Sequence, residues 1–149
     1  MSEVVVKSLS NLMNEVSYGN YNTFLTDEPI EAGGEDAGPD PYTLLLAALG
    51  SCISMTTKLY AKRKGWPLDS VTVRLRQKRV HAADCVTCDE KAEGFVHQIE
   101  RSVTFEGNLS GEQIARLQEI AHKCPVHKTF TSAIVVTDLK EETAADSDG

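Results

Sequence analysis

Apolar and polar positions alternate in short runs over the first part of the chain and then give way to one long apolar run. Val4–Leu25 combines the run VVVKS with turn residues such as Gly19, which predicts short strands joined by tight turns. Residues 28–41, EPIEAGGEDAGPDP, are rich in Gly, Pro and acids and predict a loop. The apolar run LLLAAL follows directly, so the loop leads into a helix.

This helix is signalled at both ends. Asp40 can accept hydrogen bonds from free amides as the N-cap, and Pro41 has the fixed φ that suits the first helical position. Three basic side chains precede Gly65, which suits a left-handed cap, and Pro67 follows. A helix over Pro41–Lys64 is predicted. Its first half is apolar on every side, which indicates burial that one small sheet cannot provide, so we expect a dimer to cover it.

Two further runs alternate with a period of two. SVTVRLRQKRV (70–80) and FVHQIERSVTF (95–105) each place apolar side chains on one face, as half-exposed strands do. They are expected to pair as antiparallel neighbours, with the basic residues of the first run across from Glu100 and Glu106. A solvated charge ladder is therefore preferred to a nucleic-acid patch.

The last third of the chain predicts a helix and a strand. Ser110 and Gln113 fit a capping box, and an apolar stripe continues to Cys124, before Pro125 stops the helix. SAIVVTDL (132–139) is expected to be a closing strand. The order of elements predicts an α+β fold in a single domain over residues 1–139, with a disordered acidic tail over residues 140–149.

Composition limits the possible partners. The chain has 149 residues, 41% hydrophobic and 25% charged, with a formal net charge of −7. This balance argues against binding nucleic acid or an anionic membrane, both of which favour clustered Lys and Arg. The N-terminus lacks a signal-peptide pattern and no run of 18 apolar residues occurs, so a cytoplasmic protein with a small-molecule or protein partner is expected.

Four cysteines remain to be explained, and in a reducing compartment they favour redox, catalytic or metal roles over structural bridges. Cys52 lies on an apolar stripe of the first helix, and taken alone it favours packing. Cys124 lies on the apolar stripe of the second helix. If the two helices pack together, the two thiols come within reach of each other.

The settings of the two thiols differ. A C-terminal helix dipole disfavours a thiolate at Cys124, whereas Cys52 in mid-helix escapes that penalty. Cys52 is therefore expected to attack a peroxide and form a sulfenic acid, and Cys124 to condense with it to a disulfide that a thiol reductant reopens. His127 and Lys128 are the candidate cations, with an ordinary exposed loop as the alternative for both. His122 is expected only to complement the helix dipole.

A second cluster is HAADCVTCDE, with His81, Cys85 and Cys88 at H-x3-C-x2-C spacing. A structural zinc site needs four ligands, and His97 is a candidate for the fourth. A zinc site, a redox or regulatory dithiol and an unremarkable loop all stay open. No other cofactor is expected.

The stretch GGEDAGPDPYTLLLAALGSC, followed far along the chain by KCPVHKTF, resembles the OsmC/Ohr family of thiol-dependent hydroperoxide reductases. The resemblance extends to about Leu139. It implies antiparallel sheets with two long central helices, an intertwined homodimer, and active sites at the subunit interface. It also implies Cys52 as the peroxidatic thiol, Cys124 as the resolving thiol, and an antioxidant role in the stress response, with a hydroperoxide substrate and a thiol reductant.

The chain departs from the family pattern at the partners of the first thiol. The position of the family's Glu is Tyr42, and Lys7 is the only cationic side chain before Lys58. Stand-ins for the acid are Glu31, Glu35 or Asp36, and stand-ins for the base are Arg63, Arg74, Arg76 or His127. The alternative function is a non-catalytic module of the same fold that binds a small apolar or thiol-reactive ligand in the dimer cleft.

Overall fold

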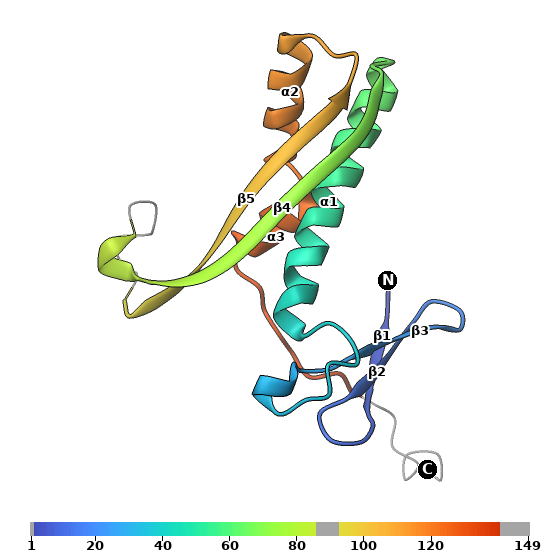
Figure 1. The fold of residues 1–149 in the computed structure, drawn as a ribbon, viewed down its shortest axis with the longest axis vertical. Coiled ribbons are helices and arrows are strands. Elements are labelled where there is room, and N and C mark those ends of the chain that lie inside the picture. Colours follow the sequence, from blue (N-terminus) through green and yellow to red (C-terminus); the bar gives the residue numbers. More distant parts are fainter. Residues whose placement is uncertain (1, 86–92, 141–149) are drawn as a thin grey trace.

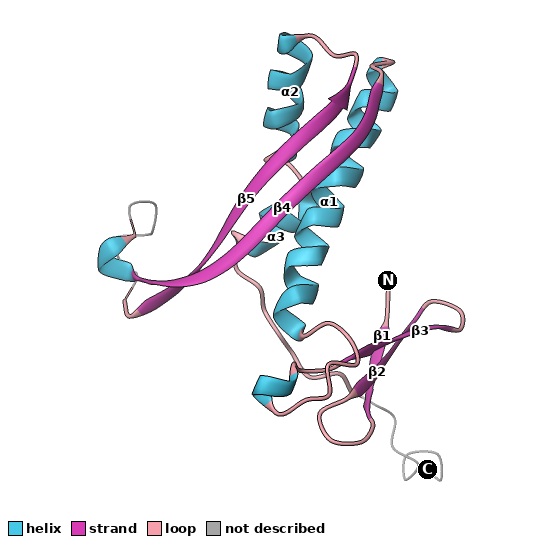
Figure 2. Ribbon diagram, in the orientation of Figure 1, coloured by secondary structure: helices cyan, strands magenta, loops and turns pink. Residues whose placement is uncertain are grey.

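The computed structural model describes residues 2–85 and 93–140, which form two antiparallel sheets and a group of helices (Figures 1 and 2). In chain order the elements are β1 (Val4–Ser8), β2 (Asn14–Tyr18), β3 (Asn22–Thr26), the 3-10 turn η1 (Ile30–Ala32), α1 (Pro41–Lys64), β4 (Leu68–His81), the 3-10 turn η2 (Ala82–Asp84), β5 (Phe95–Gly107), α2 (Gly111–Ala121) and α3 (Pro125–Phe130). The predicted α+β class is confirmed. The predicted acidic tail, from residue 141 onward, lies outside the described residues.

The N-terminal strands form a meander in the order β1-β2-β3, which confirms the strands predicted before Leu25. In Figure 1 this small sheet lies beyond the N-terminal end of α1, away from the long β4–β5 hairpin. All five residues of β1 are exposed, including three consecutive valines. Apolar side chains on an exposed edge strand indicate a surface that another chain can cover.

The loop after β3 is organised by one buried carboxylate. Asp27, which is 3% exposed, accepts hydrogen bonds from the backbone amides of Glu28 at 2.8 Å, Glu35 at 3.1 Å and Ala37 at 3.2 Å. Burial favours a higher pKa for Asp27, but these amides outweigh it and lower the pKa below its ordinary value. The carboxylate thus fixes the path of the loop into α1.

The helix predicted over Pro41–Lys64 is confirmed at both ends. The backbone amide of Thr43 donates to the Asp40 carboxylate at 2.7 Å. Gly65 adopts φ 70°, a left-handed conformation that suits glycine, and its amide donates to carbonyls of the last turn. By length and composition alone α1 is long and apolar enough to cross a membrane, but core helices of soluble proteins also meet this criterion. Here one face of it packs against β4, α2 and α3.

Burial of α1 differs between its two sides. The buried positions face the hairpin and α2, and they are Leu49, Gly50, Ile53, Thr57 and Ala61. On the other side Leu45 is 45% exposed, Met55 65% and Leu59 55%. This side of α1 is therefore left exposed in the single chain, and its cover by a second copy stays a prediction.

β4 and β5 pair antiparallel along nearly their whole length, as predicted, with Val73 opposite Val103. Apolar side chains alternate with exposed polar ones. Arg76 lies opposite Glu100, which forms an ion pair with Lys78, so part of the predicted charge ladder is present. Glu106 instead accepts a hydrogen bond from the Ser70 hydroxyl at 3.0 Å.

The predicted capping box at the start of α2 is present: the Ser110 hydroxyl and the Gln113 side chain each accept the other residue's backbone amide. The predicted end of this helix is wrong. α2 ends at Ala121, and a separate short helix, α3, begins at Pro125. A proline at the first helical position begins a helix as readily as it stops a preceding one.

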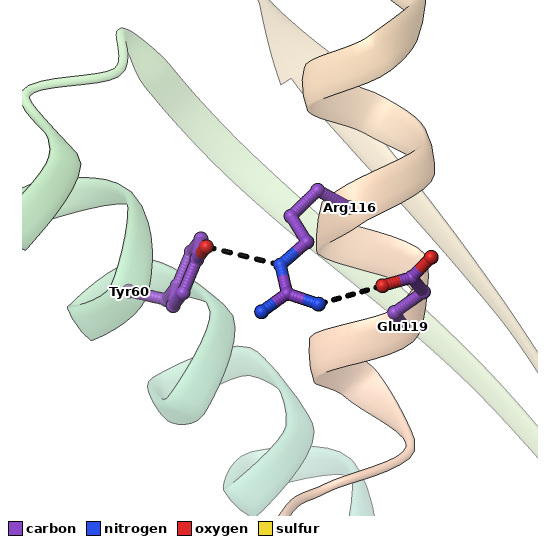
Figure 3. A network of polar contacts seen from close by, with 3 residues as sticks. All are labelled: Tyr60, Arg116 and Glu119. Carbon is purple, nitrogen blue, oxygen red and sulfur yellow. Dashed lines mark hydrogen bonds and ion pairs between the residues drawn. The ribbon is translucent and has the colours of Figure 1, made fainter.

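Two buried clusters hold the helices on the hairpin. One contains Leu49, Ile53, Ala121 and Cys124, and the other contains Ala61, Leu68 and Leu117. Beside the second cluster, the Arg116 guanidinium donates to the Tyr60 hydroxyl at 3.1 Å and to the Glu119 carboxylate at 2.7 Å, which ties α2 to α1 (Figure 3).

The predicted closing strand over 132–139 is not formed. These residues have no regular structure, and Val135 and Val136 are 81% and 90% exposed. A strand needs a partner for its backbone amides and carbonyls, and no described edge of either sheet pairs with this segment. Its apolar side chains add a third uncovered surface to β1 and the outer side of α1.

Candidate functional site

Cys52 lies in the middle of α1, at the boundary between the buried and exposed sides of the helix. Its side chain is half-buried and packs on the cluster that contains Leu49 and Ile53. Its Sγ lies 3.8 Å from the hydroxyl of Thr56, one turn further along the same helix. The thiol is therefore fixed by a rigid element and reachable from one side.

Cys124 is fully buried between α2 and α3. Because α2 ends at Ala121, the thiol does not lie in the last turn of that helix, and the predicted opposition from its dipole is replaced by a different contact. Cys124 is the N-cap of α3, and its Sγ accepts the backbone amide of His127 at 3.2 Å. A hydrogen bond to sulfur favours the charged form of a thiol.

The structure brings the two thiols together in one apolar cluster, and both are free. Burial raises the pKa of Cys124 above its ordinary value, and the hydrogen bond and charge of Cys52 act in the same direction. The amide of His127 and the charge of Arg101 lower the pKa of Cys124 and offset part of this rise. Cys52 is thus the more accessible thiol and Cys124 the enclosed one.

Arg101 is the cation that sequence analysis missed. Its guanidinium Nη1 donates to the Ala121 carbonyl at 3.0 Å, and its Nη2 contacts His122 Nδ1. The alternating pattern of β5 could have identified this residue, because Arg101 lies between Ile99 and Val103 on the apolar face of the strand. A charge in a row of apolar positions indicates a buried partner.

His127 lies on α3, half-buried, close to the same cation. Burial lowers the pKa of His127, and the positive charges of Arg101 and His122 lower it further. The predicted role of His127 as the cation is therefore weakened, since these neighbours favour its neutral form. Lys128 is exposed.

A pocket of about 320 Å³ borders the cluster that contains Cys124, although neither Cys52 nor Cys124 lines it. Its wall combines apolar, polar and three basic side chains, and it is lined by Leu49, Cys85, Val96, His97, Gln98, Ile99, Arg101, His127, Phe130 and Thr131. Leu49, Ile99 and Phe130 also pack against the cluster that holds Cys124. The pocket can hold a small, mainly apolar molecule against the cluster that contains the thiols.

The residues proposed to replace the family's acid and base lie at different places in the fold. Tyr42 stacks on His97 with ring centroids 5.0 Å apart. Glu35 is exposed in the loop before α1, where its backbone amide, rather than its carboxylate, binds Asp27. The remaining candidates are exposed: Glu31, Asp36, Arg63, Arg74 and Arg76.

Of the predicted zinc ligands, His81 lies at the far end of the hairpin, whereas Cys85 and His97 line the pocket. His81 Nδ1 accepts the amide of Ala83 at 3.2 Å, and its ring packs edge-on against Phe95. Within residues 2–85 and 93–140 no three His, Cys, Asp or Glu side chains gather as a metal site would require. Cys88 lies outside the described residues, so the ligand set with Cys85 stays a prediction.

Comparisons with known proteins agree with this fold. A family model described as OsmC-like protein matches residues 33–138. An organic hydroperoxide resistance protein OsmC from Legionella pneumophila is 19% identical with a TM-score of 0.62, covering 87% of this chain and 88% of that one.

Two further solved structures have the same architecture. An OsmC-like protein from Mycoplasma pneumoniae is 16% identical with a TM-score of 0.67, covering 88% of this chain and 87% of that one. The organic hydroperoxide resistance protein OhrB of Bacillus subtilis is 20% identical with a TM-score of 0.58, covering 87% and 89%. At these identities the likeness establishes the fold. No curated protein sequence matches the chain significantly.

Proposed function

Because the chain belongs to the family of OsmC-like proteins, we propose that it is a thiol peroxidase that reduces organic or small hydroperoxides through Cys52 and Cys124. The observation that carries the proposal is the interaction of the half-buried Cys52 with the buried Cys124 in one apolar cluster. Two solved structures of this fold are named as organic hydroperoxide resistance proteins, which supports the same class of substrate.

The dithiol can carry a complete cycle. The Cys52 thiolate attacks the terminal oxygen of the hydroperoxide, the O–O bond breaks, and the alcohol leaves with a proton. Cys52 is then a sulfenic acid. Cys124 condenses with it, the S–S bond forms, and water is released. A thiol reductant attacks the disulfide and returns both residues to thiols. In the reducing cytoplasm such a reductant is available.

The pocket that borders the cluster of the two thiols suits an organic hydroperoxide. Leu49, Ile99 and Phe130 contribute apolar surface for a hydrocarbon tail. Arg101 and His127 lie on the same wall and can orient the polar end of the molecule. No step of this cycle requires a cofactor, although Cys85, one of the candidate zinc ligands, lies on the wall of the same pocket.

A homodimer is part of the proposal. Among the residues that the structure describes, three apolar surfaces are left uncovered in the single chain: the valines of β1, the apolar side of α1 around Leu45, Met55 and Leu59, and the segment 132–139. Cys52 borders the second of these surfaces. A second copy that covers α1 would therefore also form part of the wall around the reactive thiol.

Peroxide consumption tests the proposal. Reduced protein is mixed with cumene hydroperoxide, and peroxide loss and free thiols are followed together. Wild-type protein should consume one equivalent without reductant and lose two thiols. Cys52→Ser should abolish consumption, and Cys124→Ser should leave a sulfenic acid that dimedone traps. Ser51→Ala, an exposed neighbour on α1, is the matched control.

A second candidate function is a non-catalytic module that binds a small apolar ligand in the same pocket. The observation that favours it is Tyr42, which stacks on His97 where the family resemblance places an acid. Undiminished peroxide loss after Cys52→Ser, or none in the wild type, would refute the peroxidase and leave this binding function.

A further inference from the structure

Arg101 occupies an unusual position for a charged side chain. It is half-buried on the inner face of β5, between Ile99 and Val103, which pack against the cluster that contains Cys124. Its neighbours on the outer face of the hairpin, such as Arg74 on β4, are exposed. A guanidinium on an apolar face is costly unless its donors are used.

The donors of Arg101 are directed at the chain segment that ends α2. Nη1 donates to the Ala121 carbonyl at 3.0 Å, and Nη2 contacts His122 Nδ1. Ala121 is buried in the same cluster as Cys124. The contacts therefore hold a permanent positive charge beside the segment that carries the enclosed thiol.

Three described elements contribute groups that shift the pKa of Cys124: Cys52 from α1, Arg101 from β5 and the backbone amide of His127 on α3. The His122 ring lies beside that of His127 and contacts Arg101, and β4 contributes the apolar side chains of Val73 and Leu75 to the cluster. His127 is a poor cation, because burial and its positive neighbours lower its pKa. A guanidinium is a fixed positive charge in proteins, so Arg101 is the charged side chain that can act together with the His127 amide to stabilise a thiolate at Cys124.

We propose that Arg101 is a positioning residue for the resolving step, holding its guanidinium beside Cys124 so that this buried thiol can ionise. The inference rests on the proposed peroxidase function for its kinetic part only. In that step the Cys124 thiolate attacks the sulfur of the Cys52 sulfenic acid. The S–S bond forms, the S–O bond breaks, and hydroxide leaves and takes up the proton that Cys124 released.

The Coulomb interaction of Arg101 with Cys124 lowers the pKa of that thiol, which supports the assignment. A lower pKa of Cys124 should speed the step in which Cys124 attacks the Cys52 sulfenic acid. An opposite charge close to an ionisable group changes a pKa by about one unit or more. If the pKa of Cys124 rises by one unit, about tenfold fewer Cys124 side chains are ionised at a pH below that pKa. Because a more basic thiolate is a better nucleophile, the net rate falls only about threefold for each unit.

The first experiment requires no peroxidase activity. Cysteine labelled with ¹³C at Cβ is introduced into the Cys52→Ser variant, and the Cβ shift of residue 124 is titrated by NMR. Arg101→Met should raise the pKa of Cys124 by about one unit. Arg101→Lys should rescue most of this rise, and Arg74→Gln, which removes an exposed charge from the outer face, should leave the titration unchanged.

A purely structural role for Arg101 predicts a different result. If Arg101→Met and Arg101→Gln both leave the Cys124 titration where it is, the guanidinium only ties β5 to α2, and the proposal is overturned. Met retains apolar packing next to Ile99 and Val103, so this variant carries the test if Gln prevents folding.

The second experiment uses a single turnover with cumene hydroperoxide. Whatever its effect on the rate at which the sulfenic acid forms, Arg101→Met should convert the sulfenic acid to the disulfide about threefold more slowly than the wild type. Slower formation of the sulfenic acid with unchanged resolution would place the effect on Cys52 and refute the proposal. A wild type that consumes no peroxide refutes the peroxidase, and the NMR titration still decides the role of Arg101.

Discussion

The backbone amide of His127 donates a hydrogen bond to the Sγ of Cys124 over 3.2 Å, and this contact makes the thiol the N-cap of α3. The same sulfur is fully buried and packed beside Ala121. One side chain thus has two tasks, since it both starts a helix and supplies the enclosed member of the dithiol. These tasks can be separated by substitution.

Replacing Cys124 should separate capping from redox chemistry. Serine is a good N-cap, so Cys124→Ser should keep α3, whereas Cys124→Ala should lose about 1 kcal/mol of unfolding free energy with the cap. Both variants lose disulfide formation. Urea unfolding measures the first effect, and thiol counting after oxidation measures the second. Equal stability of the two variants would show that the cap contributes nothing.

Much of the fold could be predicted from local signals. Asp40, Pro41 and Gly65 specify α1 because each satisfies a local requirement of a helix end. Ser110 and Gln113 do the same for α2. The alternating runs of β4 and β5 specify both strands and their pairing, since one face of each must be buried.

The failures arose where neighbours in space decide the structure. Pro125 can follow a helix or begin one, and only the buried position of Cys124 shows that it begins α3. The segment 132–139 has the side chains of a strand, yet it has no pairing edge among the described residues. Arg101 was missed because its partner, the Ala121 carbonyl, lies on an element that is remote in sequence.

Asp27 should make the loop before α1 sensitive to acid. Its pKa is lowered in the folded protein, despite burial, by three amide hydrogen bonds. The stability it contributes is therefore present above the unfolded pKa of about 3.9 and is lost as pH falls through the lower folded value. Asp27→Asn should reduce the free energy of unfolding at pH 7. It should also make this free energy, measured by urea unfolding, less dependent on pH in the acid range. Glu31→Gln, an exposed carboxylate in the same loop, is the charge-matched control, and equal effects of both variants would contradict this role.

His127 should contribute a second, milder dependence on pH. Burial and the charges of Arg101 and His122 lower its pKa in the folded state. Below about pH 6.5 the unfolded chain therefore takes up this proton more readily, and stability falls as pH drops towards the folded pKa. His127→Gln should remove this slope while keeping the amide that caps Cys124. The exposed neighbour variant Lys128→Gln should keep the wild-type slope, and a slope that survives His127→Gln would assign it to another group.

Met55 tests whether a second copy covers the apolar side of α1. It is 65% exposed between the exposed Leu45 and Leu59 on the same helix, next to the half-buried Cys52. A carboxylate placed in an apolar interface would lose its hydration without a partner, so Met55→Glu should shift a dimer towards monomer in sedimentation equilibrium. Thr104→Glu, which adds the same charge on the exposed face of β5, should leave the mass unchanged.

If the Met55→Glu protein keeps the wild-type mass, α1 is not the dimer contact, and the uncovered β1 strand or the segment 132–139 becomes the surface to substitute next. If it becomes monomeric and its Cys52 reacts with small alkylating agents several-fold faster, the second copy also forms a wall of the site.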